Sequence, residues 1–192
     1  MGTAPSARAR LFELLRTHAF ARRRVILASG RESDFFIDCK QVVLTAEGHT
    51  LVGELMLEAI AILSERPLAV AGVELGGCPL ASAVSVVSFL KGAPLDAIYV
   101  RKELKTHGSG RLLEGNAHLA SGAKIAILED VVTSGGSTLK AAEKLRNAGY
   151  LVVGVIALVD RVEGGKEALA SEGLSLHALY TRMDFMTEPQ AT

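Results

Sequence analysis

From about residue 68 onward, short apolar runs alternate with stretches that have helical periodicity. Strands that are apolar along their whole length are buried on both faces, and strands separated by helices usually pair in parallel. Strands are expected at residues 69–73, 97–100, 124–128, 151–158 and 175–179, and helices between them at 80–90, 139–148 and 164–172. The pattern predicts an α/β fold with a central, mostly parallel sheet flanked by helices.

The N-terminal part has a different pattern. Helices are expected at residues 6–20 and 47–63, and two short strands at 25–27 and 35–37. Arg22, Arg23 and Arg24 lie between the first helix and the first strand, and we expect them in a solvated turn. Pro79 is expected at the first position of the helix that follows strand 69–73.

The composition excludes several classes of protein. Hydrophobic residues make up 49% and charged residues 22%, which is typical of a globular chain, and the formal net charge of zero gives no reason to expect nucleic-acid binding. The sequence contains no run of about 18 apolar residues, so it predicts no membrane span. Its start is unlike a signal peptide. Cys39 and Cys78 lack metal-binding spacing, so we expect reduced thiols in a cytoplasmic protein.

Ligands of parallel sheets bind at the carboxyl ends of the strands. The most informative strand end follows residues 126–128, where Glu129 and Asp130 precede a loop rich in Thr, Ser and Gly and then a helix. Loop N–H groups and hydroxyls bind phosphate, and adjacent carboxylates can accept hydrogen bonds from a diol or hold a metal through water. The run therefore predicts a ribose 5-phosphate site, with an ordinary strand-to-helix turn as the alternative. The loop after Asp130 lacks the glycine and lysine spacing of nucleotide-binding loops.

A second strand end carries a cationic segment. Residues 101–111 hold four Lys or Arg residues, one carboxylate, His107 and two glycines. Long loops in compact domains are usually functional, so we expect a lid that closes over a polyanion and neutralises a leaving pyrophosphate. The alternative is a solvated loop without a role.

Residues 128–137 and 101–108 closely resemble type I phosphoribosyltransferases. The 101–108 segment, the run 29–38 and the run Asp160-Arg161-x-Glu163-Gly164-Gly165 resemble the orotate-using members in particular. These motifs cover most of the chain in family order. The resemblance implies the type I fold in a single domain, residues 1–192, with a small hood formed by residues 1–45 and the C-terminal segment. It also implies transfer of the 5-phosphoribosyl group from 5-phosphoribosyl 1-diphosphate to orotate, in pyrimidine (UMP) biosynthesis.

The resemblance assigns roles residue by residue. It implies catalytic roles for Lys105, His107 and Asp130. Binding of 5-phosphoribosyl 1-diphosphate is implied for Arg101, Lys102, Lys105, His107, Glu129, Asp130, Val131, Val132, Thr133, Ser134, Gly135, Gly136 and Ser137. Orotate contacts are implied for Thr133, Arg161, Phe35 and Phe36, although each phenylalanine is equally consistent with the hydrophobic core.

Further implications concern the metal and the assembly. Mg²⁺ is expected on the diphosphate, reaching Glu129 and Asp130 through water and without a direct protein ligand. A homodimer is expected in which the 101–115 loop acts in the partner's site. Some members have lysines where this chain has Ala28 and Gly76, so its site has two fewer cations. The alternatives are a phosphoribosyltransferase for another nucleobase and a non-catalytic, ligand-binding regulator of the same fold.

Overall fold

The computed structural model describes residues 5–26, 32–103 and 111–187. In these ranges the strands are β1 (Phe20–Ile26), β2 (Glu32–Ile37), β3 (Ala69–Val73), β4 (Asp96–Val100), β5 (Leu113–Glu114), β6 (Lys124–Val132), β7 (Leu151–Asp160) and β8 (Leu176–Thr181). The helices are α1 (Ala7–His18), α2 (Lys40–Val43), α3 (Ala46–Ile60), α4 (Gly77–Leu90), α5 (Gly136–Asn147), α6 (Gly165–Ser171) and α7 (Arg182–Met186).

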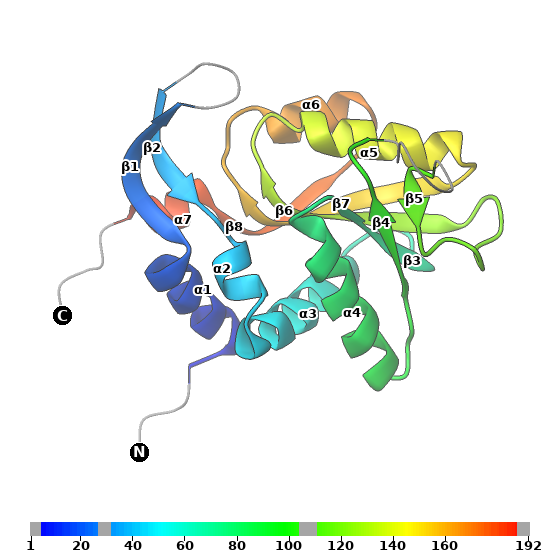
Figure 1. The fold of residues 1–192 in the computed structure, drawn as a ribbon, viewed down its shortest axis with the longest axis horizontal. Helices are drawn as coiled ribbons and strands as arrows, with labels where there is room; N and C mark the ends of the chain where they lie inside the picture. Colours follow the sequence, from blue (N-terminus) through cyan, green and yellow to red (C-terminus); the bar gives the residue numbers. More distant parts are fainter. Residues whose placement is uncertain (1–4, 27–31, 104–110, 188–192) are drawn as a thin grey trace.

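The central sheet has six strands in the order β5-β4-β3-β6-β7-β8 (Figure 1). Strands β3, β4, β6, β7 and β8 pair in parallel, and only the two-residue β5 is antiparallel to its neighbour β4. Strands β1 and β2 form a separate antiparallel hairpin. The predicted α/β class with a mostly parallel sheet is confirmed.

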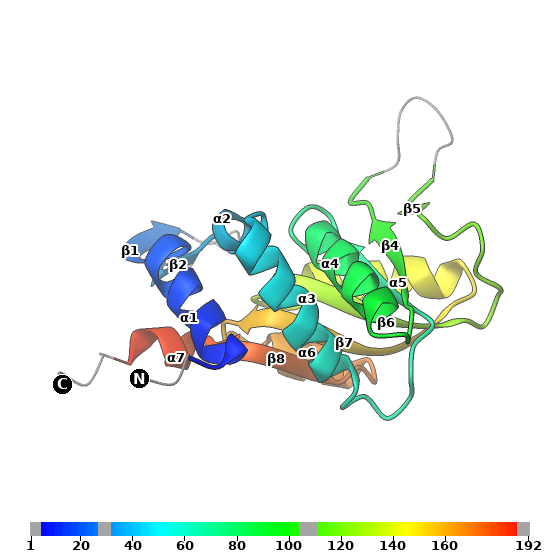
Figure 2. The same cartoon turned by 90° about the horizontal axis from the view of Figure 1, so that it is seen from below.

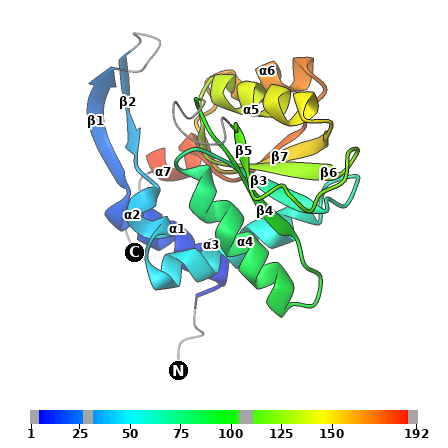
Figure 3. The same ribbon diagram turned by 45° about the vertical axis from the view of Figure 1, so that its right-hand side comes forward.

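Each face of the sheet is covered by helices. Successive strand residues point to opposite faces, so Leu128 of β6 joins one hydrophobic cluster and its neighbour Ile127 joins the other. Helices α3 and α4 lie over the Leu128 face, and α5 and α6 lie over the Ile127 face (Figure 3). Both faces are dry, which explains why β3 is buried along its whole length.

The N-terminal elements share the core of the first face. Leu11 and Leu15 of α1 and Phe35 of β2 are fully buried in the same cluster as Ile156 of β7. Figure 2 shows α1, α2, α3 and α4 on one side of the sheet. Helix α7 adds Phe185, whose ring centroid lies 4.9 Å from that of Phe12. The Phe185 ring also lies 5.9 Å from that of Phe35 in the hairpin and 6.2 Å from that of Tyr180 in β8, so aromatic contacts join the hairpin to the sheet.

One prediction about the N-terminal part is wrong. Strand β1 begins at Phe20, so Arg22, Arg23 and Arg24 lie in a strand and not in a solvated turn. A two-stranded ribbon keeps one face in water, and the Arg23 guanidinium lies 3.8 Å from the centre of the Phe36 ring, a cation–π contact. Arg22 pairs with Phe35, and Arg23 and Arg24 lie in an irregularity of the pairing before Val25, so the exposed charges are carried by a strand.

Several element bounds also differ from expectation. Strand β6 continues to Val132, because Glu129 and Val131 still pair with Ala157 and Val159 of β7. Helix α5 begins at Gly136, three residues before the expected start, and α4 begins at Gly77, so Pro79 lies in the first turn and not at its first position. The four-residue α2 and five-residue α7 were not expected.

The amino ends of the parallel strands are entered through glycine turns. The turns that lead into β4, β6 and β8 at the amino ends contain Gly92, Gly122 and Gly173, with φ of 75°, 80° and 72°. A Cβ added at any of these glycines would meet nothing within 4 Å.

No helix within the described ranges is long and apolar enough to span a membrane.

Candidate functional site

Four segments meet at the carboxyl ends of the parallel strands. They are residues 74–77 after β3, 101–103 after β4, 129–137 at the end of β6, and 160–163 at the end of β7. Adjacent strands β4, β3, β6 and β7 bring these segments to one edge of the sheet. The described parts of these segments therefore lie together where ligands of parallel sheets usually bind.

Glu129 lies almost fully buried on the α5 side of β6, 6% exposed. Its Oε1 accepts a hydrogen bond of 3.3 Å from Ser137 Oγ, while its buried Oε2 has no hydrogen-bond partner among the described residues. Burial, and after it the charge of the neighbouring Asp130, raises the pKa of Glu129 to about 8 against the opposing effects of Ser137 and Lys102. A buried acceptor without a partner is suited to a ligand that donates hydrogen bonds.

Asp130 is the next residue and points to the opposite face. Its Oδ1 accepts a 2.9 Å hydrogen bond from the Val131 N–H, and burial raises the pKa of its carboxyl group. A Cβ added to Gly76 would lie 2.0 Å from Asp130 Oδ2. The Asp130 carboxylate therefore occupies the space that a side chain at position 76 would need, and such a side chain would displace it. The corresponding early position, Ala28, lies outside the described residues.

The loop from Thr133 to the first turn of α5 is shaped for an anion. Gly135 has φ of 80° and stands at the N-cap of α5, without a side-chain capping bond. Ser134 and Ser137 are exposed, and the first N–H groups of α5 have no partner within the helix, so this loop offers several hydrogen-bonding groups to an anion. Behind the loop, a Cβ on Gly165 would lie 2.7 Å from the Thr133 carbonyl oxygen. The start of α6 thus supports the loop at a distance only glycine permits.

The beginning of the 101–115 segment is fixed by two polar residues. The Lys102 N–H donates to Glu74 Oε2 at 2.8 Å, and Lys144 Nζ of α5 donates to the carbonyl oxygens of Arg101 and Lys102 at 2.7 and 2.8 Å. A cavity of about 360 Å³ opens here, lined by Val73, Val100, Arg101, Lys102, Glu103, Ser137, Lys140, Ala141 and Lys144. Lys105 and His107 lie outside the described residues, so their placement stays a prediction.

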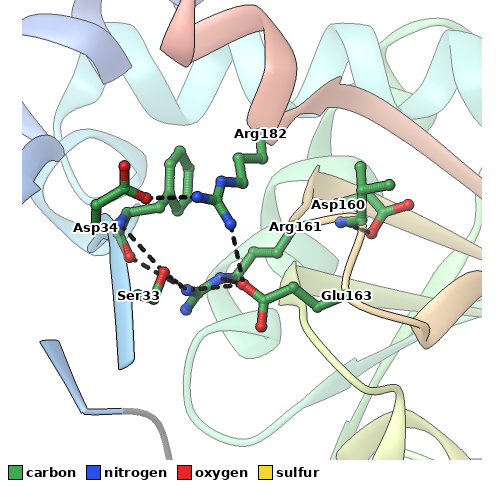
Figure 4. Close-up of polar contacts among 8 residues, drawn as sticks. Ser33, Asp34, Asp160, Arg161, Glu163 and Arg182 are labelled. Atoms are coloured by element: carbon green, nitrogen blue, oxygen red, sulfur yellow. Dashed lines mark hydrogen bonds and ion pairs between the residues drawn. The ribbon is translucent and has the colours of Figure 1, made fainter. Parts of the chain in front are cut away.

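Arg161 follows β7 and reaches the hairpin (Figure 4). Its Nη2 donates to Ser33 Oγ at 3.0 Å and to the Phe35 carbonyl oxygen at 3.2 Å, and its Nε donates to Glu163 Oε1 at 3.0 Å. The residue is only 9% exposed. A guanidinium held on one side by these acceptors keeps its Nη1 group for another planar acceptor such as a carboxylate.

The two phenylalanines predicted near the base have different environments. Phe35 is fully buried, with its ring 5.2 Å from that of Phe20 and 5.9 Å from that of Phe185, which is the core alternative left open by the sequence. Phe36 lies on the opposite face of β2 and is half-buried beneath Arg23. Thr133, also predicted to contact the base, is half-buried in the loop after β6.

Sequence reasoning missed Lys144 and Arg182. Lys144 follows Lys140 at helical spacing, so a basic pair on one face of the predicted helix was an available signal. Arg182 had no such signal, because its position depends on the short helix α7. Within the described ranges no group of three or more His, Cys, Asp or Glu residues could hold a metal ion.

Comparison with known proteins gives consistent results. Residues 44–176 match the family model for the phosphoribosyl transferase domain. The orotate phosphoribosyltransferase of Sorangium cellulosum strain So ce56 is 67% identical over 183 residues, covering 95% of each chain. That of Synechocystis is 48% identical, covering 93% of this chain and 89% of the relative. The crystal structure of Mycobacterium tuberculosis orotate phosphoribosyltransferase with 5-phospho-alpha-D-ribosyl 1-diphosphate has a TM-score of 0.76 at 33% identity, covering 94% of this chain and 99% of that one.

Proposed function

This chain belongs to the phosphoribosyl transferase family, among its orotate phosphoribosyltransferases, and we propose that it makes orotidine 5′-monophosphate and pyrophosphate from orotate and 5-phosphoribosyl 1-diphosphate. This is the transfer that forms the pyrimidine nucleotide in UMP biosynthesis. The observation that carries the proposal is the convergence of the Glu129–Asp130 pair, the uncapped start of α5 and Arg161 at one edge of the sheet.

The ribose 5-phosphate binds along the end of β6. Glu129 and Asp130 accept hydrogen bonds from the vicinal hydroxyls of the ribose, and the buried Glu129 Oε2 supplies an acceptor without an internal partner among the described residues. The 5-phosphate lies against the N–H groups and hydroxyls of residues 131–137, where the positive end of the α5 dipole favours an anion.

The diphosphate binds between the strand ends of β3 and β4. Arg101 and Lys102 supply positive charge, and we assign Lys105 and His107 to the same anion as groups that neutralise the departing pyrophosphate. Mg²⁺ fits this site because the carboxylates of Glu129 and Asp130 are the oxygen groups that can hold its water ligands. When bound on the diphosphate, it offsets charge on the leaving group. The absence of lysines at positions 28 and 76 leaves this task to the cations of residues 101–105.

Orotate lies between the loop after β6 and the hairpin. Arg161 pairs with the carboxylate of orotate, which explains why an arginine is held in a largely buried position. Thr133 contacts the base, and Phe36 flanks its ring. Phe35 supports the base site from the core, with the Arg161 guanidinium 5.4 Å from the centre of its ring.

Catalysis is by position and charge. The bond from the anomeric carbon to the diphosphate oxygen breaks ahead of bond formation, and pyrophosphate leaves with the electron pair. A ring nitrogen of orotate then forms its bond to the oxocarbenium-like carbon and loses its proton, which the departing pyrophosphate accepts. Asp130 and Glu129 hold the ribose, Arg161 holds the base, and Lys105 and His107 stabilise the leaving group, so no protein nucleophile is needed.

We assign the active form to a homodimer in which residues 101–115 act in the partner's site. Support comes from the apolar end of α4, where Val86, Phe89 and Leu90 are 60%, 72% and 77% exposed. Mixing Lys105→Ala chains with Asp130→Asn chains should restore activity in heterodimers, because one of the two sites is then intact. Mixing either variant with itself is the control. No recovery in heterodimers shown to form would contradict a shared site.

Two further assignments complete the proposal. Residues 1–45 and the C-terminal segment form a hood within a single domain, which agrees with the sharing of one core by α1, the hairpin and α7. A cytoplasmic location is supported by the two free, buried cysteines.

The direct test is a spectrophotometric assay of orotate loss with 5-phosphoribosyl 1-diphosphate and Mg²⁺. We expect turnover of orotate and none of adenine, hypoxanthine or uracil. Turnover of another base without orotate would favour a different phosphoribosyltransferase. Tight binding of the substrates without turnover of any base would favour a non-catalytic regulator.

A further inference from the structure

Glu163 lies between two guanidinium groups (Figure 4). Its Oε1 is 3.0 Å from Nη2 of Arg161 and 3.8 Å from Nη1 of Arg182. The side chains of Glu163 and Arg161 are each 10% exposed, and that of Arg182 is 28% exposed. Arg182 also pairs with Asp34 of β2, whose side chain is 53% exposed. Elements that are far apart in the sequence thus form one charged cluster.

The charges of this cluster are not equally effective. The Arg161–Glu163 pair is largely buried, so each charge acts strongly on the other. Glu163 alone would cancel most of the positive potential that Arg161 offers to a bound carboxylate. Arg182 takes a share of the Glu163 charge, while the opposing charge of Asp34 is half exposed and screened by water. Arg182 therefore offsets part of the negative charge that Glu163 places beside Arg161.

We propose that Arg182 is a positioning residue that determines specificity for an anionic base. It offsets Glu163, so that the Arg161 guanidinium stays in place and keeps its attraction for the carboxylate of the base. This inference rests on the proposed function, because it concerns the same base site. The competing explanation is purely mechanical, namely that the Arg182–Asp34 pair fastens the hairpin to α7.

Two substitutions separate these explanations. Arg182→Gln and Asp34→Asn both break the same ion pair, so a mechanical role predicts that both raise the KM for orotate. An electrostatic role predicts opposite directions. Arg182→Gln should raise the KM for orotate by roughly five- to tenfold, the effect of one partly buried charge, and Asp34→Asn should lower it slightly or leave it unchanged. The KM for 5-phosphoribosyl 1-diphosphate should change less than about twofold in either variant.

Arg182→Lys provides the matched control, because it keeps the charge and should recover most of the affinity for orotate. Thermal unfolding of each variant shows whether the fold is intact. A rise in the KM for orotate in Asp34→Asn that equals the rise in Arg182→Gln would overturn the inference, as would an equal rise in the KM for both substrates. These results leave the proposed function standing. No orotate turnover by the unmodified chain would overturn both.

Discussion

The buried carboxyl group of Glu129 should make the protein less stable as the pH rises. Its pKa is about 8 in the folded chain, against 4.5 for an unperturbed glutamate, which is the value expected in the unfolded chain. The contribution of the protonated Glu129 to the free energy of unfolding is therefore fully present below about pH 4.5, and it is lost as the pH rises to about 8. Each pH unit well inside this window corresponds to about 1.4 kcal/mol, and the slope falls near pH 8 where the group is half ionised, so about 2 kcal/mol is lost between about pH 6 and pH 8.

Glu129→Gln removes this titration and keeps the size of the side chain. The free energy of unfolding, measured by urea denaturation at about pH 6 and pH 8, should therefore fall by about 2 kcal/mol less in the variant than in the unmodified protein. The comparison of two pH values cancels any constant effect of the amide. Binding of 5-phosphoribosyl 1-diphosphate should weaken at both, since a ribose acceptor is lost.

Glu143→Gln is the control, because Glu143 is an exposed carboxylate on α5. It should follow the unmodified protein at both pH values. The reasoning would be refuted if the difference in unfolding free energy between Glu129→Gln and the unmodified protein were the same at both pH values. In that case burial would not set the protonation of Glu129.

Three other predictions follow from side-chain contacts and backbone geometry in and beside the site. Lys144→Met should raise the KM for 5-phosphoribosyl 1-diphosphate roughly tenfold, because it releases the backbone of residues 101–102. Lys140→Met, in the same cavity, is the control and should change this KM much less. Steady-state kinetics of both variants test the prediction. Gly76→Ala should displace Asp130 and lower kcat/KM at least about tenfold, and unchanged kinetics would show that the carboxylate moves freely. Val162→Asn should raise stability by about 0.5–1 kcal/mol in thermal unfolding, because φ of 55° is unfavourable for a β-branched residue.

The sequence was sufficient wherever the relevant chemistry is local. Glu129, Asp130 and the loop after them could be recognised because a strand, its exit and the next helix are consecutive in the chain. The burial and the parallel pairing of the central strands follow from their apolar runs, separated by helices, for the same reason. The ends of β6 and α5 could not be placed, since pairing with β7 extends β6 beyond its last apolar residue before the carboxylates.

Side-chain contacts between elements that are far apart in the chain could not be predicted from the sequence. Arg182 meets Glu163 only because α7 packs beside the hairpin, and nothing near residue 182 indicates this. The alternation of a strand places Phe35 and Phe36 on opposite faces but does not say which face is dry. The sequence alone predicts a turn at Arg22, Arg23 and Arg24, because consecutive charged residues are found both in loops and on the exposed face of a short two-stranded ribbon.

The glycine turns before β4, β6 and β8 give the molecule an end that is suitable for attachment. They lie at the opposite end of the strands from Glu129 and Arg161, and the space around Gly92, Gly122 and Gly173 is open. A fluorophore or surface tether joined through a cysteine next to one of these glycines would leave the substrates' approach clear. Single-molecule or immobilised assays of turnover could use this end.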